Sequence, residues 1–140
     1  MRVVVDTNIL VSGLLSSSGP PAKIVSAILK GTLIPVMSEA TFAELEDVLQ
    51  RPRLQPLFTR AGVNSSLFLA DLQKLAHLVK PQVVPDTIRD EADRPFLELM
   101  ASRPAPQFLI TGDKDFERER YQGVPVISAS WFVELVLRSR

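Results

Sequence analysis

Short runs of aliphatic, mostly β-branched residues alternate along this chain with longer segments whose apolar residues recur at helical spacing. The short runs predict strands and the longer segments predict helices, because side-chain direction repeats about every two residues in a strand and about every 3.6 in a helix. This alternation favours an α/β fold with a mostly parallel sheet. Ligands bind beyond the carboxyl ends of such strands, so polar residues that follow each run are candidates for a functional site.

The expected strands cover residues 2–5, 33–37, 108–111 and 124–127, with Val83-Val84 as a further short candidate. Pro35 weakens the second of these predictions, because proline cannot donate a hydrogen bond within a sheet. The expected helices cover residues 22–30, 39–50, 64 or 65 to 79 and 94–102, and a final one that begins at Ser128 or Ser130. Ser38 is the expected N-cap of the helix 39–50, and Pro95 is tolerated in the first turn of its helix.

The 140 residues fit a single domain, expected over residues 1–140, and a hydrophobic content of 46% argues against disorder. The absence of cysteine excludes disulfides and thiolate metal sites. No apolar run approaches the roughly 18 residues of a membrane span, and the run Val3 to Val5 is too short for a signal peptide. We therefore expect a soluble, cytoplasmic protein. Equal numbers of basic and acidic residues, 16 of each, mean that any binding of nucleic acid must rest on a local site.

Two aspartates follow expected strands. Asp6 comes directly after Val3-Val4-Val5, and Asp113 follows the strand 108–111 and Gly112. Both positions suit a functional carboxylate at the edge of the sheet. Both also suit a turn or capping residue, as do Thr7 and Asn8 after the first strand, and Asp115 suits the cap of a following short helix.

Asp93 leads the buried stripe of an expected helix. Phe96, Leu97 and Met100 lie three, four and seven residues later, on the same helical face. A carboxylate there is costly unless something satisfies it. It is therefore either the N-cap of the helix or a metal ligand that points into a cleft.

Glu44 lies on the flank of the apolar stripe of the helix 39–50, whereas Asp47 lies opposite that stripe. Glu46 occupies the other flank and is the rival candidate. Together with Asp6, Asp93 and Asp113, one of these glutamates would provide the oxygen ligands that Mg²⁺ and Mn²⁺ prefer. Zinc is not indicated, because His77 is the single histidine and is expected to be a packed or surface residue.

Four short motifs, in order along the chain, resemble those of PIN domains. They are the segments 3–12 (from Val3-Val4-Val5-Asp6-Thr7-Asn8), 44–54 (Glu44-Leu45 to Arg51-Pro52-Arg53-Leu54), 90–97 (Asp-Glu-Ala-Asp-Arg-Pro-Phe-Leu) and 111–116 (Thr-Gly-Asp-Lys-Asp-Phe). The subgroup that the chain looks most like contains proteins identified as toxins of toxin–antitoxin pairs, related to the VapC toxins.

This resemblance implies a three-layer α/β/α sandwich with a central mostly parallel sheet, and Mg²⁺- or Mn²⁺-dependent hydrolysis of RNA. By motif it implies that the metal-binding and catalytic acids are Asp6, Glu44, Asp93 and Asp113, with Asp115 as a fifth metal ligand. Thr111 would support the site, and Asn8 would hold the loop after the first strand through its amide. An antitoxin protein and a homodimer are the implied partners.

The third motif departs from the family pattern. The family usually has an aspartate where Ala92 stands, and Pro95 is unexpected within the motif. Asp90 or Glu91 is therefore the alternative to Asp93 as the third acid.

The expected mechanism uses one or two Mg²⁺ ions to activate water and leaves 5′-phosphate and 3′-hydroxyl ends. Candidate phosphate contacts are basic residues near the second and fourth motifs, although ordinary solvation is the simpler explanation for each. They are Arg51, Arg53, Lys114, Arg118 and Arg120. Single-stranded or looped RNA is the expected substrate.

Two other functions compete with this hypothesis. The first is a catalytically inactive PIN scaffold that binds RNA or a protein partner. The second is a phosphotransfer enzyme or a receiver domain on a related α/β sheet. A haloacid-dehalogenase-type phosphatase, however, would need Asp-x-Asp after the first strand, and Asn8 stands where its second aspartate would be.

Overall fold

The computed structural model describes residues 1–85, 87–112, 116 and 118–138. The strands are β1 (Arg2–Val5), β2 (Ile34–Met37), β3 (His77–Leu78), β4 (Phe108–Ile110), β5 (Arg120–Tyr121) and β6 (Val124–Ile127). The α-helices are α1 (Thr7–Leu15), α2 (Pro20–Leu29), α3 (Glu39–Leu49), α4 (Gln55–Ala61), α5 (Ser65–Leu75), α6 (Arg94–Leu99) and α7 (Ala129–Phe132). Two 3₁₀ turns, η1 (Pro52–Leu54) and η2 (Glu91–Asp93), precede α4 and α6, and a π-helical turn, η3 (Val133–Leu137), continues α7.

The six strands form one sheet in the order β3-β2-β1-β4-β6-β5. All neighbouring pairs are parallel except β5 and β6. Strand β1 lies between β2 and β4, with Val5 beside Ile110. The residues that follow β1 and β4 are therefore neighbours at the carboxyl edge of the sheet, where a ligand site is expected.

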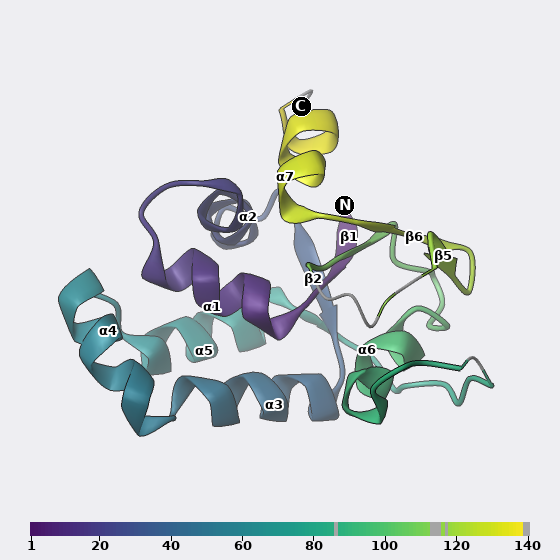
Figure 1. The fold of residues 1–140 in the computed structure, drawn as a ribbon, viewed down its shortest axis with the longest axis horizontal. Coiled ribbons are helices and arrows are strands. Elements are labelled where there is room, and N and C mark those ends of the chain that lie inside the picture. The colour runs from purple at the N-terminus through teal and green to yellow at the C-terminus, as the bar shows by residue number, and fades with distance from the viewer. Residues whose placement is uncertain (86, 113–115, 117, 139–140) are drawn as a thin grey trace.

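Helices cover both faces of the sheet (Figure 1). Val3 and Val5 point into a large core that contains residues of α1, α2, α3, α4, α5 and α7. Val4, which points the opposite way, packs in a second core with residues of α6. The molecule is thus the three-layer α/β/α sandwich with a mostly parallel sheet that the sequence predicts. Within the described residues, no helix is both long and apolar enough to cross a lipid bilayer.

Several predicted elements have the expected bounds. Strands β1 and β6 match their predictions, while β2 begins one residue later and β4 ends one residue earlier than predicted. Ser38 caps α3 as expected: its hydroxyl oxygen accepts the Thr41 N–H at 3.2 Å, and the Thr41 hydroxyl oxygen accepts the Ser38 N–H at 2.9 Å. Ser128, rather than Ser130, caps the final helix by accepting the Trp131 N–H.

Pro35 lies within an inner strand without breaking it. The Ile34 N–H donates to Met1 O at 2.8 Å, so the backbone groups of residue 34 face β1. Because these groups alternate along a strand, the nitrogen of Pro35 faces the β3 side. The pairing of β3 with β2 begins only opposite Val36, so no hydrogen bond of the β2–β3 ladder is lost.

Helix α1 was not predicted, because Asn8, Ser12 and Gly13 interrupt the apolar pattern after Asp6. Asp6 nevertheless caps this helix, since its Oδ1 accepts the Asn8 N–H at 3.2 Å. A Cβ on Gly13 would lie 2.5 Å from Pro21 O, which shows how closely α1 approaches the start of α2. The glycine therefore permits the packing that holds this helix on the sheet.

The segment after α5 also differs from the prediction. Helix α5 ends at Leu75 instead of near Val79, and Ala76 is extended. Residues His77–Leu78 then pair with β2, so this stretch adds an edge strand instead of a last helical turn. The expected strand at Val83-Val84 is absent from the described structure: Val84 is buried, but Val83 is 93% exposed.

The remaining differences concern the ends of two helices and two short elements that were not predicted. Helix α6 begins at Arg94 as predicted, with Pro95 in its first turn, but ends at Leu99 instead of residue 102. Helix α2 begins at Pro20, two residues before the predicted start. Helix α4 and strand β5 were not predicted, because each is too short to show a clear periodicity.

Candidate active site

The carboxylate of Asp6 lies at the carboxyl end of β1 and is only 7% exposed. Its Oδ1 accepts the Asn8 N–H, and its Oδ2 accepts the hydroxyl of Thr111 at 2.7 Å. The backbone also fixes it, because the Asp6 N–H donates to Ile110 O at 3.0 Å. These contacts come from the start of α1 and from the neighbouring strand, so the orientation of this carboxylate is fixed by the fold.

Thr111 directly follows β4 and is 5% exposed. Its backbone N–H donates to Ile127 O at 3.0 Å, while its hydroxyl donates to Asp6. Thr111 therefore links the carboxyl ends of β1, β4 and β6. The supporting role that the family resemblance implies for Thr111 stays a prediction.

Asn8 contributes to the site in a different way from that expected. The chain after β1 is a helix instead of a loop, and the Asn8 group that contacts Asp6 is its backbone N–H. The residue is exposed. The support that we expected from its side-chain amide thus comes from the main chain at the helix N-terminus.

Glu44 is half-buried in the middle of α3, on the side that meets α1. Its Oε2 accepts the hydroxyl of Thr7 at 3.0 Å. Burial raises the pKa of Glu44, and the negative charge of Asp6 raises this pKa further, against the lowering effects of the Thr7 hydrogen bond and of Arg51. The two carboxylates of Asp6 and Glu44 are thus close enough to repel each other.

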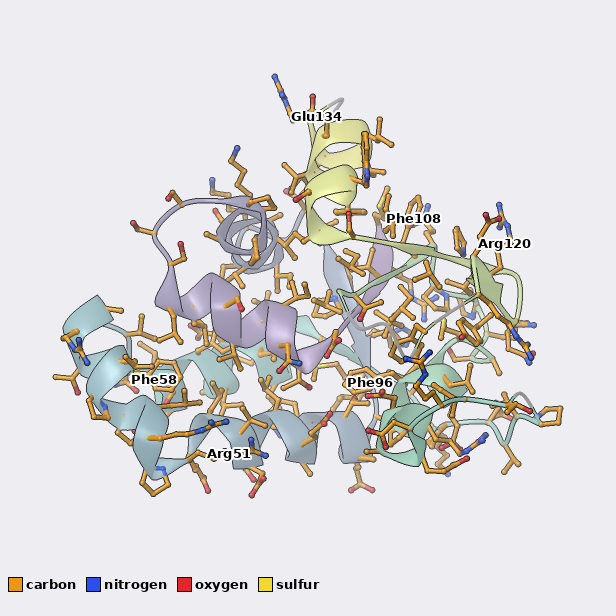
Figure 2. The ribbon with its side chains drawn as sticks, viewed as in Figure 1. Arg51, Phe58, Phe96, Phe108, Arg120 and Glu134 are labelled. Atoms are coloured by element: carbon orange, nitrogen blue, oxygen red, sulfur yellow. The ribbon has the colours of Figure 1, made fainter. Side chains whose placement is uncertain are left out.

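The rival glutamate and the neighbouring aspartate lie elsewhere on α3. Glu46 and Asp47 are both exposed, as the helical periodicity predicts for Asp47. Asp47 is paired with Arg51 at 3.7 Å, at the carboxyl end of the helix. Figure 2 labels Arg51 there. Glu44 is therefore the acid of this helix that lies with Asp6.

Thr7 was not identified as a site residue from the sequence, where it was read as a turn residue. Its hydroxyl bridges from the first residue of α1 to Glu44 of α3, and its side chain is buried. An Asp-Thr pair after a buried strand is a signal for a helix N-terminus, because aspartate is a preferred N-cap. That signal would have placed Thr7 in the first turn of this helix, next to the Asp6 carboxylate.

Asp93 lies at the junction between η2 and α6 and is half-buried. Phe96, Leu97 and Met100 are buried, which confirms the stripe that this carboxylate leads. Asp93 occupies the N-cap position of α6, but its side chain makes no capping hydrogen bond. Asp93 thus stands at the N-cap position that the sequence offered as its simpler explanation, without the side-chain bond of a capping aspartate, and its role as a metal ligand stays a prediction.

The two alternative acids of the third motif have other roles. Asp90 is exposed, and its Oδ1 accepts the Ala92 N–H at 3.0 Å as the cap of η2. Glu91 is exposed and accepts a hydrogen bond from Arg94 at 2.9 Å, which lowers the pKa of Glu91. Asp93 is the least exposed acid of this motif.

The expected acids of the fourth motif, Asp113 and Asp115, and the basic residue Lys114 lie outside the described residues. Thr111 and Gly112, which precede them, are at the carboxyl end of β4 beside Asp6. Among the residues that the structure describes, no three His, Cys, Asp or Glu side chains gather closely enough to hold a metal ion. The described part of the acidic site is thus the pair Asp6 and Glu44.

The basic candidates differ in their surroundings. Arg51 is close enough to the site for its positive charge to lower the pKa of Glu44. Arg118 lies over the ring of Tyr121, with its guanidinium carbon 5.6 Å from the ring centroid. Arg53 and Arg120 are exposed. Of these residues, Arg51 is the best placed to contact a phosphate near the two acids.

His77 is a surface residue, as expected. It is exposed in the edge strand β3, and its Nδ1 accepts the Arg2 Nε–H at 3.1 Å. A neutral imidazole nitrogen is needed to accept this bond. The histidine thus has a structural partner at the edge of the sheet.

The mostly parallel sheet has helices on both faces. A buried carboxylate lies at the carboxyl end of a central strand, and a glutamate of a helix lies near it. These features define an α/β domain with an acidic site. A family model described as PIN domain matches residues 2–115. The chain therefore belongs to the PIN domain family. PIN domains are generally nucleases, which are hydrolases; they bind RNA and commonly use divalent metal ions.

One curated relative supports the match without adding a function. The chain is 26% identical over 115 residues to the uncharacterized protein MJ1680 of Methanocaldococcus jannaschii. The aligned region covers 82% of this chain and 72% of that protein. The similarity therefore extends over most of both chains.

Proposed function

We propose that this protein is a metal-dependent endoribonuclease that hydrolyses RNA phosphodiester bonds with Mg²⁺ or Mn²⁺. The observation that carries this proposal is the pair of carboxylates from Asp6 and Glu44. Asp6 directly follows β1 and Glu44 lies in α3. Burial and the negative charge of Asp6 both raise the pKa of Glu44. Close like charges of this kind are stabilised by a cation between them.

The chemistry of the donors fits a hard divalent ion. All the candidate ligands are carboxylate oxygens, which Mg²⁺ and Mn²⁺ prefer, and the chain has no cysteine. Asp6 would hold the ion with Asp93 and Asp113, and Asp115 is a further candidate ligand. Such an ion, when bound, would supply a more acidic water and neutralise charge on the phosphate.

The protein groups around Asp6 have distinct roles in this proposal. Thr111 and the N–H of Asn8 fix the Asp6 carboxylate, so that it is oriented before substrate arrives. Glu44, held by the Thr7 hydroxyl, would accept a hydrogen bond from the attacking water and orient it. Arg51 would contact a phosphate oxygen at the end of α3. Hydrolysis by water would leave 5′-phosphate and 3′-hydroxyl ends.

A cleavage assay tests this proposal. Wild type and the variants Asp6→Asn and Glu44→Gln are incubated with single-stranded RNA in Mg²⁺, Mn²⁺ or EDTA, and product ends are identified. We expect cleavage only by wild type with metal. Glu46→Gln is the matched control and should cleave like wild type, because Glu46 is exposed on the same helix as Glu44. Undiminished cleavage by Asp6→Asn would remove Asp6 from the mechanism.

Complete inactivity of the wild type with either metal would instead favour the inactive scaffold. In that case, binding of RNA or of a protein partner would be the function. Calorimetry with Mn²⁺ distinguishes the nuclease from the inactive scaffold, since the scaffold would not need to bind the ion.

The same proposal extends to the biological role. The four motifs resemble those of VapC-like toxins, and we propose that the chain is the toxin of a toxin–antitoxin pair in the cytoplasm. Its partners would be an RNA substrate, an antitoxin protein and a second copy of the chain. Growth arrest on expression of wild type, but not of Asp6→Asn, is the expected result. Light scattering of the purified protein tests for the homodimer.

A further inference from the structure

A basic groove runs between α2 and the helical segment formed by α7 and η3. It has a volume of about 450 Å³. Lys23, Lys30 and Arg138 line it together with the hydroxyls of Ser26 and Thr32, and apolar side chains from both helices form its floor. Of the described residues, none that lines the groove is acidic. The groove thus combines positive charge with hydrogen-bond donors.

The two lysines are available for an external anion. Lys23 lies in α2 and Lys30 is the C-cap of this helix, seven positions later and still in the helical region, so both lie on the same side and roughly 10 Å apart along the axis. Both are exposed, and neither forms an ion pair with another residue in the described part of the chain. Arg138 donates to Glu134 at 2.8 Å, in an exposed pair that is worth little in free energy.

The groove lies apart from the acidic site. Lys30 and Thr32 follow α2 and precede β2, so they are near the amino end of the sheet, whereas Asp6 is at the carboxyl end of β1. In Figure 1, α2 and α7 lie on the opposite side of the molecule from α3 and α6. Figure 2 shows Glu134 near the top of the C-terminal segment, well separated from Phe96 of α6.

We propose that this groove binds the phosphate backbone of single-stranded RNA, at a position remote from the bond that is cleaved. The inference rests on the proposed function for the identity of its ligand as RNA. Lysine ammonium groups bind phosphates as point charges, and serine and threonine hydroxyls donate to phosphate oxygens. Two ammonium groups along one helix suit a repeating anion, and the apolar floor suits the ribose rings between phosphates.

Binding measured without metal tests this proposal directly. The probe is a fluorescent single-stranded RNA of about 20 nucleotides in EDTA, long enough to cover more than one site. The variant is Lys23→Gln/Lys30→Gln, and the matched control is Lys74→Gln/Lys80→Gln, which changes the net charge equally. Circular dichroism and thermal unfolding check that both variants fold, since Lys30 is also the C-cap of α2.

Loss of two phosphate contacts should weaken binding about 25-fold at 0.1 M salt and reduce the salt slope of log K by about 1.4. The control variant should bind like wild type. Equal affinity of all three proteins would overturn the proposal, as would equal losses in both variants, which would mean that net charge alone matters. A wild type that does not bind RNA would also overturn it.

These outcomes are distinct from those of the cleavage assay. RNA binding that depends on Lys23 and Lys30, in a protein that cleaves no RNA with either metal, would support the groove and contradict the nuclease. Cleavage that is lost in Asp6→Asn, with binding unaffected by the lysine variants, would support the nuclease and contradict the groove.

Discussion

The hydroxyl of Thr111 donates a hydrogen bond to Asp6 Oδ2 at 2.7 Å, between residues that are 105 positions apart in the sequence. Both side chains are buried, with 5% and 7% exposed. The bond joins the ends of β1 and β4, which are parallel neighbours. The hydroxyl that follows one strand, together with the Asn8 N–H on Oδ1, therefore orients the acid that follows the other strand.

Replacing Thr111 with valine keeps the shape of the side chain and removes this donor. Thr111→Val should lose about 1–2 kcal/mol of unfolding free energy, because a buried carboxylate loses a partner. Cleavage should fall by about 10- to 100-fold, the usual cost of removing a group that orients a metal ligand. Urea unfolding and cleavage rates measure the two effects, and Thr111→Ser should restore both. Wild-type values for the valine variant would show that the bond does not orient Asp6.

The half-buried Glu44 should make stability depend on pH in the absence of metal. Its pKa is raised in the folded protein, chiefly by burial, so the folded state holds this proton more tightly than the unfolded chain. The resulting stabilisation is fully present below the ordinary pKa and is lost as the pH rises through the raised one. Glu44→Gln cannot titrate and should lack this loss.

Urea unfolding in EDTA between about pH 4 and pH 7 measures the difference. Wild type should become less stable relative to Glu44→Gln as the pH rises. Glu46→Gln, at an exposed position of the same helix, should follow wild type. Parallel curves for wild type and Glu44→Gln would contradict the raised pKa.

Three variants can decide which acid of the third motif belongs to the metal site. Asp93→Asn should reduce cleavage by more than about tenfold, as expected for a ligand or a group next to one. Asp90→Asn and Glu91→Gln should retain activity, because those side chains are exposed and bind Ala92 N–H and Arg94. Cleavage rates under saturating Mn²⁺ check this prediction. Loss of activity in Asp90→Asn or Glu91→Gln alone would move the third acid there.

Gly13 is a stability determinant away from the chemistry. A Cβ at this position would lie 2.5 Å from both Pro21 O and Val25 Cγ2, so α1 and α2 would have to separate. Gly13→Ala should cost about 1–3 kcal/mol of unfolding free energy, the usual range for overpacking. Gly112→Ala is the control, since no atom of the described residues, apart from its chain neighbours, lies within 4 Å of its Cβ position. A neutral Gly13→Ala would show that the two helices adjust freely.

The sequence predicted those parts of the site that depend on local patterns. The run Val3-Val4-Val5 placed Asp6 at the end of a buried strand, because three successive aliphatic residues suit a strand covered on both faces. The periodicity of α3 separated the exposed Asp47 from Glu44. The alternation of elements was enough to predict an α/β fold with a mostly parallel sheet, and the family resemblance added its three layers.

Other parts depend on tertiary contacts that no local pattern carries. Gly13 lies where α1 contacts α2. The close contact of the two helices requires a glycine there, and this glycine interrupts the apolar periodicity of α1. The Thr7–Glu44 bond joins two helices and could not be inferred from either one. The end of α5 at Leu75 is likewise decided by the pairing of His77–Leu78 with β2. In each case the partner lies far away in the sequence.

A crystal soaked with Mn²⁺ and measured for anomalous scattering tests the central claim most directly. We expect an ion bound to Asp6, with carboxylate oxygens of Asp93 and Asp113 or water held by Glu44 completing its ligands. This anomalous peak should disappear in Asp6→Asn. An ion bound elsewhere, or these acids lying too far apart to share one, would contradict the metal-dependent nuclease.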